Sequence, residues 1–140
     1  VKSPKLYFVD VGLASFLLGI EKSGDLQYHP LKGALFETFI VSEILKTRLN
    51  KVKTNNLYYF RDNVGNEVDL LLDFGTKIIP IEIKSGQTVS DDYFKNLNYY
   101  NKLNPEMVKE MFLIYSGSLC YEQKGCFIRN YKDLDVFTNC

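Results

Sequence analysis

The sequence has no long apolar run and no excess of charge of one sign. Its longest apolar stretch, residues 11–20, is well short of the roughly 20 residues that a membrane-spanning helix requires. The 17 basic and 17 acidic residues balance, so the chain as a whole lacks a basic footprint for polyanions. We therefore expect no membrane partner, and any contact with DNA must be made by a local patch.

Cysteine and histidine are too few for several kinds of site. Cys120, Cys126 and Cys140 form neither an even disulfide set nor a zinc-binding spacing, which predicts reduced thiols and a cytoplasmic location. The single His29, beside Pro30 in a predicted loop, argues against Ser-His-Asp or Cys-His catalysis. The chain also lacks a Gly-x-x-x-x-Gly-Lys-Ser/Thr phosphate loop, so no ATPase site is expected within it.

The length of 140 residues suits one domain, and we expect residues 1–140 to form a single one. The sequence begins without an initiator Met and without the charged and apolar regions of a signal peptide. It is therefore expected to be part of a longer protein.

Three short strands are predicted in the middle of the chain. Residues 57–61 are rich in aromatics, residues 68–72 are almost wholly apolar, and residues 77–84 alternate at their end, with Gly65 and Gly75 in the intervening turns. This pattern predicts an antiparallel meander.

The last of these strands carries a charged pair. Because side chains alternate along a strand, Glu82 and Lys84 share one face. Tight pairing through the Gly75 turn can bring Asp69 of the preceding strand close to Glu82. Two such carboxylates repel, so a bound cation or a raised pKa should relieve them.

The remaining elements follow from helical spacing, short apolar runs and turn residues. We expect an extended piece at residues 5–9, a helix capped by Asp10 that ends at Gly19, a loop at 21–30, and a long, largely buried helix at 31–49. A helix capped by Ser90 should end at Asn104, before a strand at 111–115, a hairpin at 119–122 and 126–128, and a helical turn within 130–137. This order predicts an α/β fold with a mixed sheet between helices.

The long helix contributes one carboxylate and several cations. Glu37 lies on an otherwise apolar side, where an unpaired charge is costly, so it needs a partner. A basic group at the helix end and in the next loop suits either a solvated helix terminus or a phosphate backbone; the candidates for nucleic-acid contact are Lys46, Arg48, Lys51 and Lys53, with Arg61 on the first strand.

These residues resemble a known active-site pattern. A carboxylate on the first core helix (Glu37), Asp69 on the second core strand and Glu82-Ile83-Lys84 on the third resemble the signature of the PD-(D/E)XK nuclease superfamily, which includes restriction endonucleases and Holliday-junction resolvases. Five ordered motifs also resemble the domain of unknown function at the C-terminus of many bacterial and archaeal AAA-type ATPases: KLYFVDVGL (5–13), GALFE (33–37), YFRD (59–62), GNEVD (65–69) and IEIKS (81–85).

The resemblance implies a restriction-endonuclease-like core and Mg²⁺- or Mn²⁺-dependent hydrolysis of DNA. Asp69 and Glu82 would be the metal ligands, since Mg²⁺ prefers hard oxygen donors. Lys84 would orient the attacking water or meet the developing phosphoryl charge, and Glu37 would be an accessory acid. An ATPase domain would precede this one in the same protein.

A second interpretation stays open. In it, Lys84 pairs with Asp69 and Glu82 as a structural ion-pair cluster, and the resemblance allows this, since families of this fold include members that no longer cut. The domain would then be an accessory module that places an ATPase on nucleic acid or on a protein partner.

Overall fold

Three apolar segments separated by glycine turns form the predicted antiparallel meander, β1 (Leu57–Arg61), β2 (Glu67–Asp73) and β3 (Ile78–Lys84). Gly65 and Gly75 adopt φ angles of 99° and 77°, which favour glycine because it has no Cβ. The central residues of β2 and β3 are buried on both faces, which explains their nearly continuous apolar sequence.

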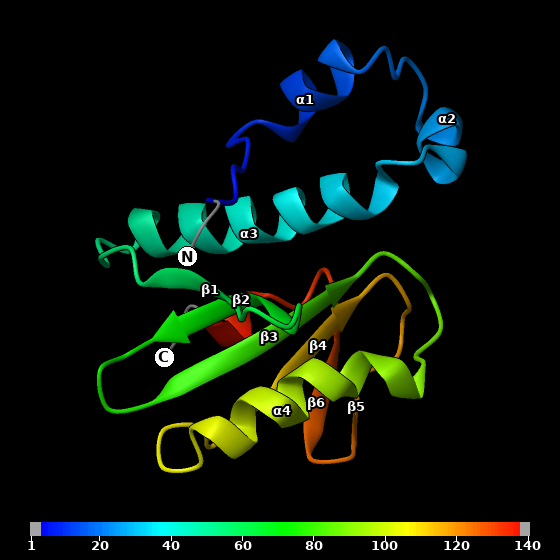
Figure 1. Cartoon of the computed structure of the whole chain (residues 1–140). Helices are drawn as coiled ribbons and strands as arrows, with labels where there is room; N and C mark the ends of the chain where they lie inside the picture. Colours follow the sequence, from blue (N-terminus) through cyan, green and yellow to red (C-terminus); the bar gives the residue numbers. More distant parts are fainter. Residues whose placement is uncertain (1–3, 138–140) are drawn as a thin grey trace.

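The computed structural model describes residues 4–137, in which the meander is one half of an open six-stranded mixed sheet (Figure 1). β4 (Phe112–Tyr115) is parallel to β3, β6 (Cys126–Asn130) is parallel to β4, and β5 (Tyr121–Gln123) is antiparallel to β6. The strand order is β1-β2-β3-β4-β6-β5. The predicted strand and terminal hairpin are confirmed, and β6 joins the hairpin to the main sheet.

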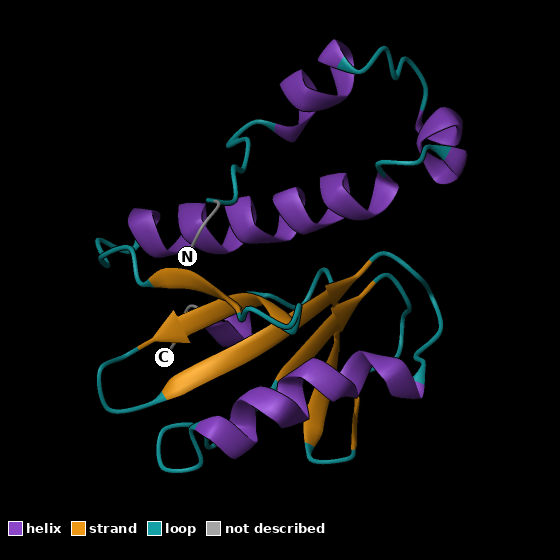
Figure 2. Cartoon of the chain, viewed as in Figure 1, coloured by secondary structure: helices purple, strands orange, loops and turns teal. Residues whose placement is uncertain are grey.

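Helices cover both faces of this sheet (Figure 2). On one face lies α3 (Lys32–Asn50), and on the other lie the 3-10 helix η1 (Asp91–Phe94) and α4 (Lys95–Leu103). Both long helices were predicted, and α3 is exposed only at its two ends. Ser90 lies at the predicted N-cap position, but within the described residues its side chain makes no capping hydrogen bond, and the helix starts as a 3-10 turn.

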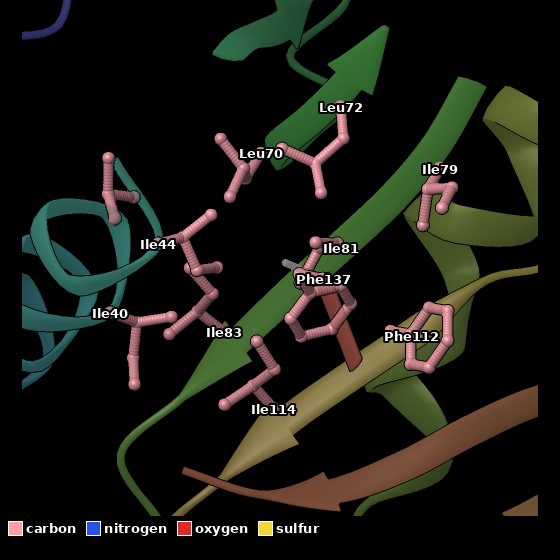
Figure 3. Packing of buried hydrophobic residues seen from close by; sticks show 11 residues of the cluster. Ile40, Ile44, Leu70, Leu72, Ile79, Ile81, Ile83, Phe112, Ile114 and Phe137 are labelled. Carbon is pink, nitrogen blue, oxygen red and sulfur yellow. The ribbon is translucent and has the colours of Figure 1, made fainter. Parts of the chain in front are cut away.

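Aliphatic side chains fill the space between α3 and the sheet. Ile40 and Ile44 point from α3 towards the strand residues Leu70, Leu72, Ile79, Ile81, Ile83, Phe112 and Ile114 (Figure 3). The predicted C-terminal turn is η2 (Asp135–Phe137), whose Phe137 is fully buried with its ring centroid 4.9 Å from that of Phe112. This cluster fixes α3 over the centre of the meander.

The segment before α3 is less regular. Asp10 caps α1 (Val11–Leu17) as predicted, its Oδ1 accepting the Leu13 N–H at 3.0 Å. The loop predicted at 21–30 is partly wrong, because α2 (Ser23–Tyr28) forms there and its Leu26 lines a cavity shared with α3. Residues 4–10, here called the N-terminal strap, have no regular secondary structure and descend from α1 towards α3 (Figure 1).

Within residues 4–137, every helix is too short or too polar to cross a bilayer. Cys120 is an exposed thiol and Cys126 a buried one. The third cysteine in the sequence prediction, Cys140, lies outside the described residues.

Gly117, just after β4, tests the packing at the end of the parallel strands. A Cβ at this position would meet the Tyr115 ring at 2.2 Å and the Gln87 carbonyl oxygen at 2.6 Å. Gly117→Ala should therefore lower the free energy of unfolding by about 1–3 kcal/mol in urea titrations. Gly24→Ala is the matched control, because nothing lies within 4 Å of its Cβ position. Equal stability of the two variants would contradict this packing.

Candidate active site

An irregularity in β2 sets the position of the central carboxylate. Between two matched pairs, β1 advances from Tyr58 to Phe60 while β2 runs from Leu71 to Val68, so β2 contains one extra residue. Such a bulge interrupts the alternation of side chains and redirects one of them. Asp69 lies in this bulge and is nevertheless buried.

The carboxylate of Asp69 accepts a main-chain hydrogen bond from β3 just beyond the point where the pairing of β2 and β3 ends. The last matched pair of these two strands on this side is Leu70 with Ile81. Beyond it, Asp69 Oδ2 accepts the backbone N–H of Ile83 at 2.8 Å, a fully buried hydrogen bond. A side chain thus replaces a main-chain carbonyl and holds a carboxylate against β3.

Glu82 and Lys84 form an ion pair with each other on β3. Lys84 Nζ lies 2.6 Å from Glu82 Oε1 and 5.6 Å from the centre of the Tyr93 ring. The Glu82 side chain is only 5% exposed, and its second oxygen, Oε2, is buried and has no hydrogen-bond partner among residues 4–137. A buried polar atom without a partner calls for an explanation, and a bound water or ion is one of them.

Burial and mutual repulsion shift the pKa values of these acids. Burial, then the negative charge of Asp69, raises the pKa of Glu82 to about 7 against the opposing effect of Lys84. Burial, then the charge of Glu37, raises the pKa of Asp69. Burial lowers the pKa of Lys84, but the charge and hydrogen bond of Glu82 prevail and hold it above its ordinary value. Both shifts have the direction expected for two carboxylates that repel each other.

A second group of charges surrounds Lys5 of the N-terminal strap. Lys5 Nζ lies 2.8 Å from Glu37 Oε1, forms an ion pair with Glu67 Oε1, and lies 3.7 Å from Asp69 Oδ1. The Tyr7 hydroxyl donates to Glu37 Oε1 at 2.6 Å. The predicted need of Glu37 for a partner is therefore met twice.

These contacts fix the charge states around Lys5. Burial lowers the pKa of Lys5, but its hydrogen bonds with Glu37 and Glu67 raise it above the ordinary value, so it stays charged. Burial raises the pKa of Glu67, but the hydrogen bonds from Lys5 and Arg61 prevail and lower it. Asp69 joins this group to the pair on β3.

Comparison with known proteins places the chain in a family. A family model described as "Domain of unknown function (DUF4143)" matches residues 32–133. The chain belongs to this family. Two relatives, "Uncharacterized protein Mb2031c" of Mycobacterium bovis and "Uncharacterized protein Rv2008c" of Mycobacterium tuberculosis, are each 34% identical to it over 89 residues. The match covers 64% of this chain and 19% of each relative, so the chain spans about a fifth of their length.

In this DUF4143 domain, four predicted site residues come together from three elements. Glu37 comes from α3, Asp69 from β2, and Glu82 and Lys84 from β3. Lys5 contacts both Glu37 and Asp69, and the charge of Asp69 acts on Glu82 on the neighbouring strand. The sequence thus located the acidic residues and Lys84, but not the ammonium group of Lys5 between Glu37 and Asp69.

The predicted nucleic-acid contacts do not gather at these acids. Lys46 pairs with Glu43 at 3.1 Å, nine residues past Glu37 and so roughly 13 Å further along the helix axis. Lys51 and Lys53 lie beyond the end of α3, whereas Arg61 reaches the site through its ion pair with Glu67.

The prediction that Arg48 contacts nucleic acid is wrong. It is 4% exposed, and its guanidinium lies 5.3 Å from the centre of the Phe74 ring. The helix turns this side chain inward, so it packs in the interior and does not face a phosphate backbone.

Sequence reasoning missed Lys5, Tyr7 and Glu67. The sequence did contain a hint of their role. Lys5 and Tyr7 are two residues apart in the motif KLYFVDVGL (5–13), and Glu67 lies in the motif GNEVD (65–69). Such spacing puts two side chains on one side of an extended segment. Which side that is depends on the path of the strap over α3, and no local pattern encodes that path.

Asp69 and Glu82 can bind a metal ion only if water or substrate supplies the remaining ligands. Among residues 4–137, no three His, Cys, Asp or Glu side chains converge closely enough to hold an ion by themselves. Mg²⁺, however, commonly takes one or two protein carboxylates and completes its shell with water and substrate phosphate. The unpartnered Glu82 Oε2 and the hard oxygens of Asp69 fit that donor set.

The raised pKa of Glu82 predicts a pH dependence of stability in metal-free buffer. With an ordinary pKa of 4.5 when unfolded and about 7 when folded, Glu82 keeps its proton longer in the folded chain. The free energy of unfolding should therefore fall as pH rises from about 4.5 to 7 and level off above that range. Glu82→Gln should remove the contribution of Glu82 to this fall, so that the variant loses less stability than the wild type and is more stable at pH 8 by on the order of 1–3 kcal/mol.

Urea titrations between pH 5 and 8 measure this effect. Glu110→Gln is the control, because it removes a surface carboxylate paired with Lys77 at 3.2 Å. If Glu82→Gln and the wild type lose stability equally over this range, Glu82 does not carry the proton.

Proposed function

We propose that this domain is a metal-dependent phosphodiesterase that hydrolyses DNA, with Asp69 and Glu82 as the ligands of Mg²⁺ or Mn²⁺. The observation that carries the proposal is the buried Oε2 of Glu82, which has no hydrogen-bond partner within residues 4–137. The other oxygen of this carboxylate, Oε1, pairs with Lys84, and the charge of Asp69 acts on the same group. Two acids with raised pKa values next to a charged lysine are typical of a catalytic site.

Each side chain has a task in this reaction. When bound, the metal ion supplies polarisation of a phosphoryl oxygen and a more acidic water. Asp69 is held in place by its hydrogen bond from Ile83 and presents its other oxygen, Oδ1. The Lys84 ammonium, with three donors, orients the attacking water or stabilises the charge that develops on the phosphoryl oxygens. Glu37 is an accessory acid, and the hydrogen bond from the Tyr7 hydroxyl holds its carboxylate in place.

A restriction-endonuclease-like core is part of the same proposal. Its support is the order of elements, in which a helix that carries an acid precedes an antiparallel meander, a crossover helix and a parallel strand. We further propose that the domain belongs to a longer cytoplasmic protein with an AAA-type ATPase domain. The five motifs support this, and the greater length of the two relatives is consistent with it.

One observation favours a second candidate function, a non-cutting accessory domain. Lys5 and Lys84 already pair with the acids, as a purely structural ion-pair network would require. Such a module would bind nucleic acid or a protein partner for the attached ATPase. The two candidates differ in metal binding and in cleavage.

Metal uptake is the first test. Calorimetry with Mn²⁺ should show binding by the wild type that Asp69→Ala and Glu82→Ala each abolish, because each removes a ligand. Glu110→Ala, which removes a carboxylate outside the site, should bind like the wild type. A wild-type protein that takes up no metal, with or without DNA, would falsify the enzyme proposal and leave the accessory module.

Cleavage of DNA is the second test. Lys84→Met should lower the rate of Mn²⁺-dependent cleavage by about 100-fold or more, because it removes charge stabilisation from the transition state. Its affinity for Mn²⁺ should change much less, since Lys84 is not a ligand.

Lys77→Met is the matched control, as it removes a lysine paired with Glu110 outside the site. Full cleavage by Lys84→Met would contradict the role of this lysine. Cleavage that persists in Asp69→Ala would show that the activity has another source.

A further inference from the structure

The N-terminal strap reaches the acidic site through alternate side chains. Lys5 and Tyr7 face inward and make the polar contacts with Glu37, whereas Leu6 and Phe8 are 86% and 43% exposed. The apolar side chains of the strap thus contribute little burial at this point. Its attachment to the site depends mainly on charge and hydrogen bonding.

The position of Lys5 coincides with the free oxygen of Asp69. Oδ2 of Asp69 is taken by the Ile83 N–H, so Oδ1 is the oxygen left for a metal ion. Lys5 Nζ lies 3.7 Å from that same Oδ1. Because a Mg²⁺ ion binds a carboxylate oxygen at about 2.1 Å, the two cations would be close neighbours and repel strongly.

The charge balance of the site also favours replacement of Lys5 by a metal ion over addition of a metal ion beside it. Four carboxylates, when ionised, face three cations, which are Lys5, Lys84 and Arg61; the carboxylates are Glu37, Glu67, Asp69 and Glu82. A divalent ion added to this set gives an excess of positive charge. A divalent ion that replaces Lys5 balances the charges.

We propose that Lys5 is a tethered counter-ion that occupies the acidic site in the absence of metal and is displaced when a divalent cation binds Asp69. The inference rests on the proposed function, because it assigns a regulation to the same metal site. Metal binding then releases the strap from Glu37 and Glu67, and anything that holds the strap away raises the affinity for metal. Lys5 is a positioning residue and does not touch the substrate.

Removal of the Lys5 charge tests this exchange. Lys5→Met keeps the length of the side chain, and it should bind Mn²⁺ about tenfold more tightly, or better, than the wild type in calorimetry. Lys46→Met is the matched control, since it removes an ammonium that pairs with Glu43 at 3.1 Å on the surface of α3, and its affinity should stay unchanged. In thermal unfolding, Mn²⁺ should raise the Tm of Lys5→Met more than that of the wild type.

A measurement on the wild type covers the case in which Lys5→Met does not fold. Trypsin needs the lysine side chain in its own pocket, so Lys5 should be protected while it is paired with Glu37 and Glu67. Addition of Mn²⁺ should accelerate cleavage after Lys5 several-fold, as measured by mass spectrometry. Cleavage after Lys22, an exposed residue just before α2, serves as the internal standard for trypsin activity.

The outcomes separate this inference from the function on which it rests. If the wild type binds Mn²⁺ and Lys5→Met binds it equally or more weakly, the counter-ion role is overturned and the metal site stands. Unchanged cleavage after Lys5 on addition of Mn²⁺ has the same meaning. If neither protein binds Mn²⁺, both the proposed function and the exchange are overturned.

Discussion

The candidate site depends on one buried hydrogen bond, in which the Asp69 carboxylate accepts the N–H of Ile83. This bond lies where the ladder between β2 and β3 ends, and it satisfies a main-chain donor that the bulge would otherwise leave without a strand partner. It also holds a charged group in the protein interior. The cost of that burial appears in the raised pKa values of Asp69 and Glu82.

The surrounding fold makes this arrangement rigid. α3 is fixed to the meander by aliphatic side chains on one face, and α4 covers the other face, so β2 and β3 have little freedom to adjust around the acids. Buried carboxylates are tolerated only when partners compensate them. Here the partners are Lys5, from a strap far away in sequence, and Lys84, from the strand itself.

This network places the DUF4143 domain between two functions. A closed set of ion pairs is what a purely structural site would need, whereas an unpartnered oxygen on Glu82 is what a metal site would need. Lys5 reconciles these features if it is the cation that a metal ion replaces. Under this proposal, the state of the site is set by which cation, Lys5 or a metal ion, pairs with Asp69.

The sequence by itself determined the meander, the two long helices and the four residues Glu37, Asp69, Glu82 and Lys84. Strand alternation and helical spacing are local, so the residues themselves carry this information. Tertiary structure alone decided the inward turn of Arg48, the bulge at Asp69, the parallel addition of β6 and the position of Lys5. Each of these depends on contacts between segments distant in the chain, and such contacts leave no periodic pattern in the sequence.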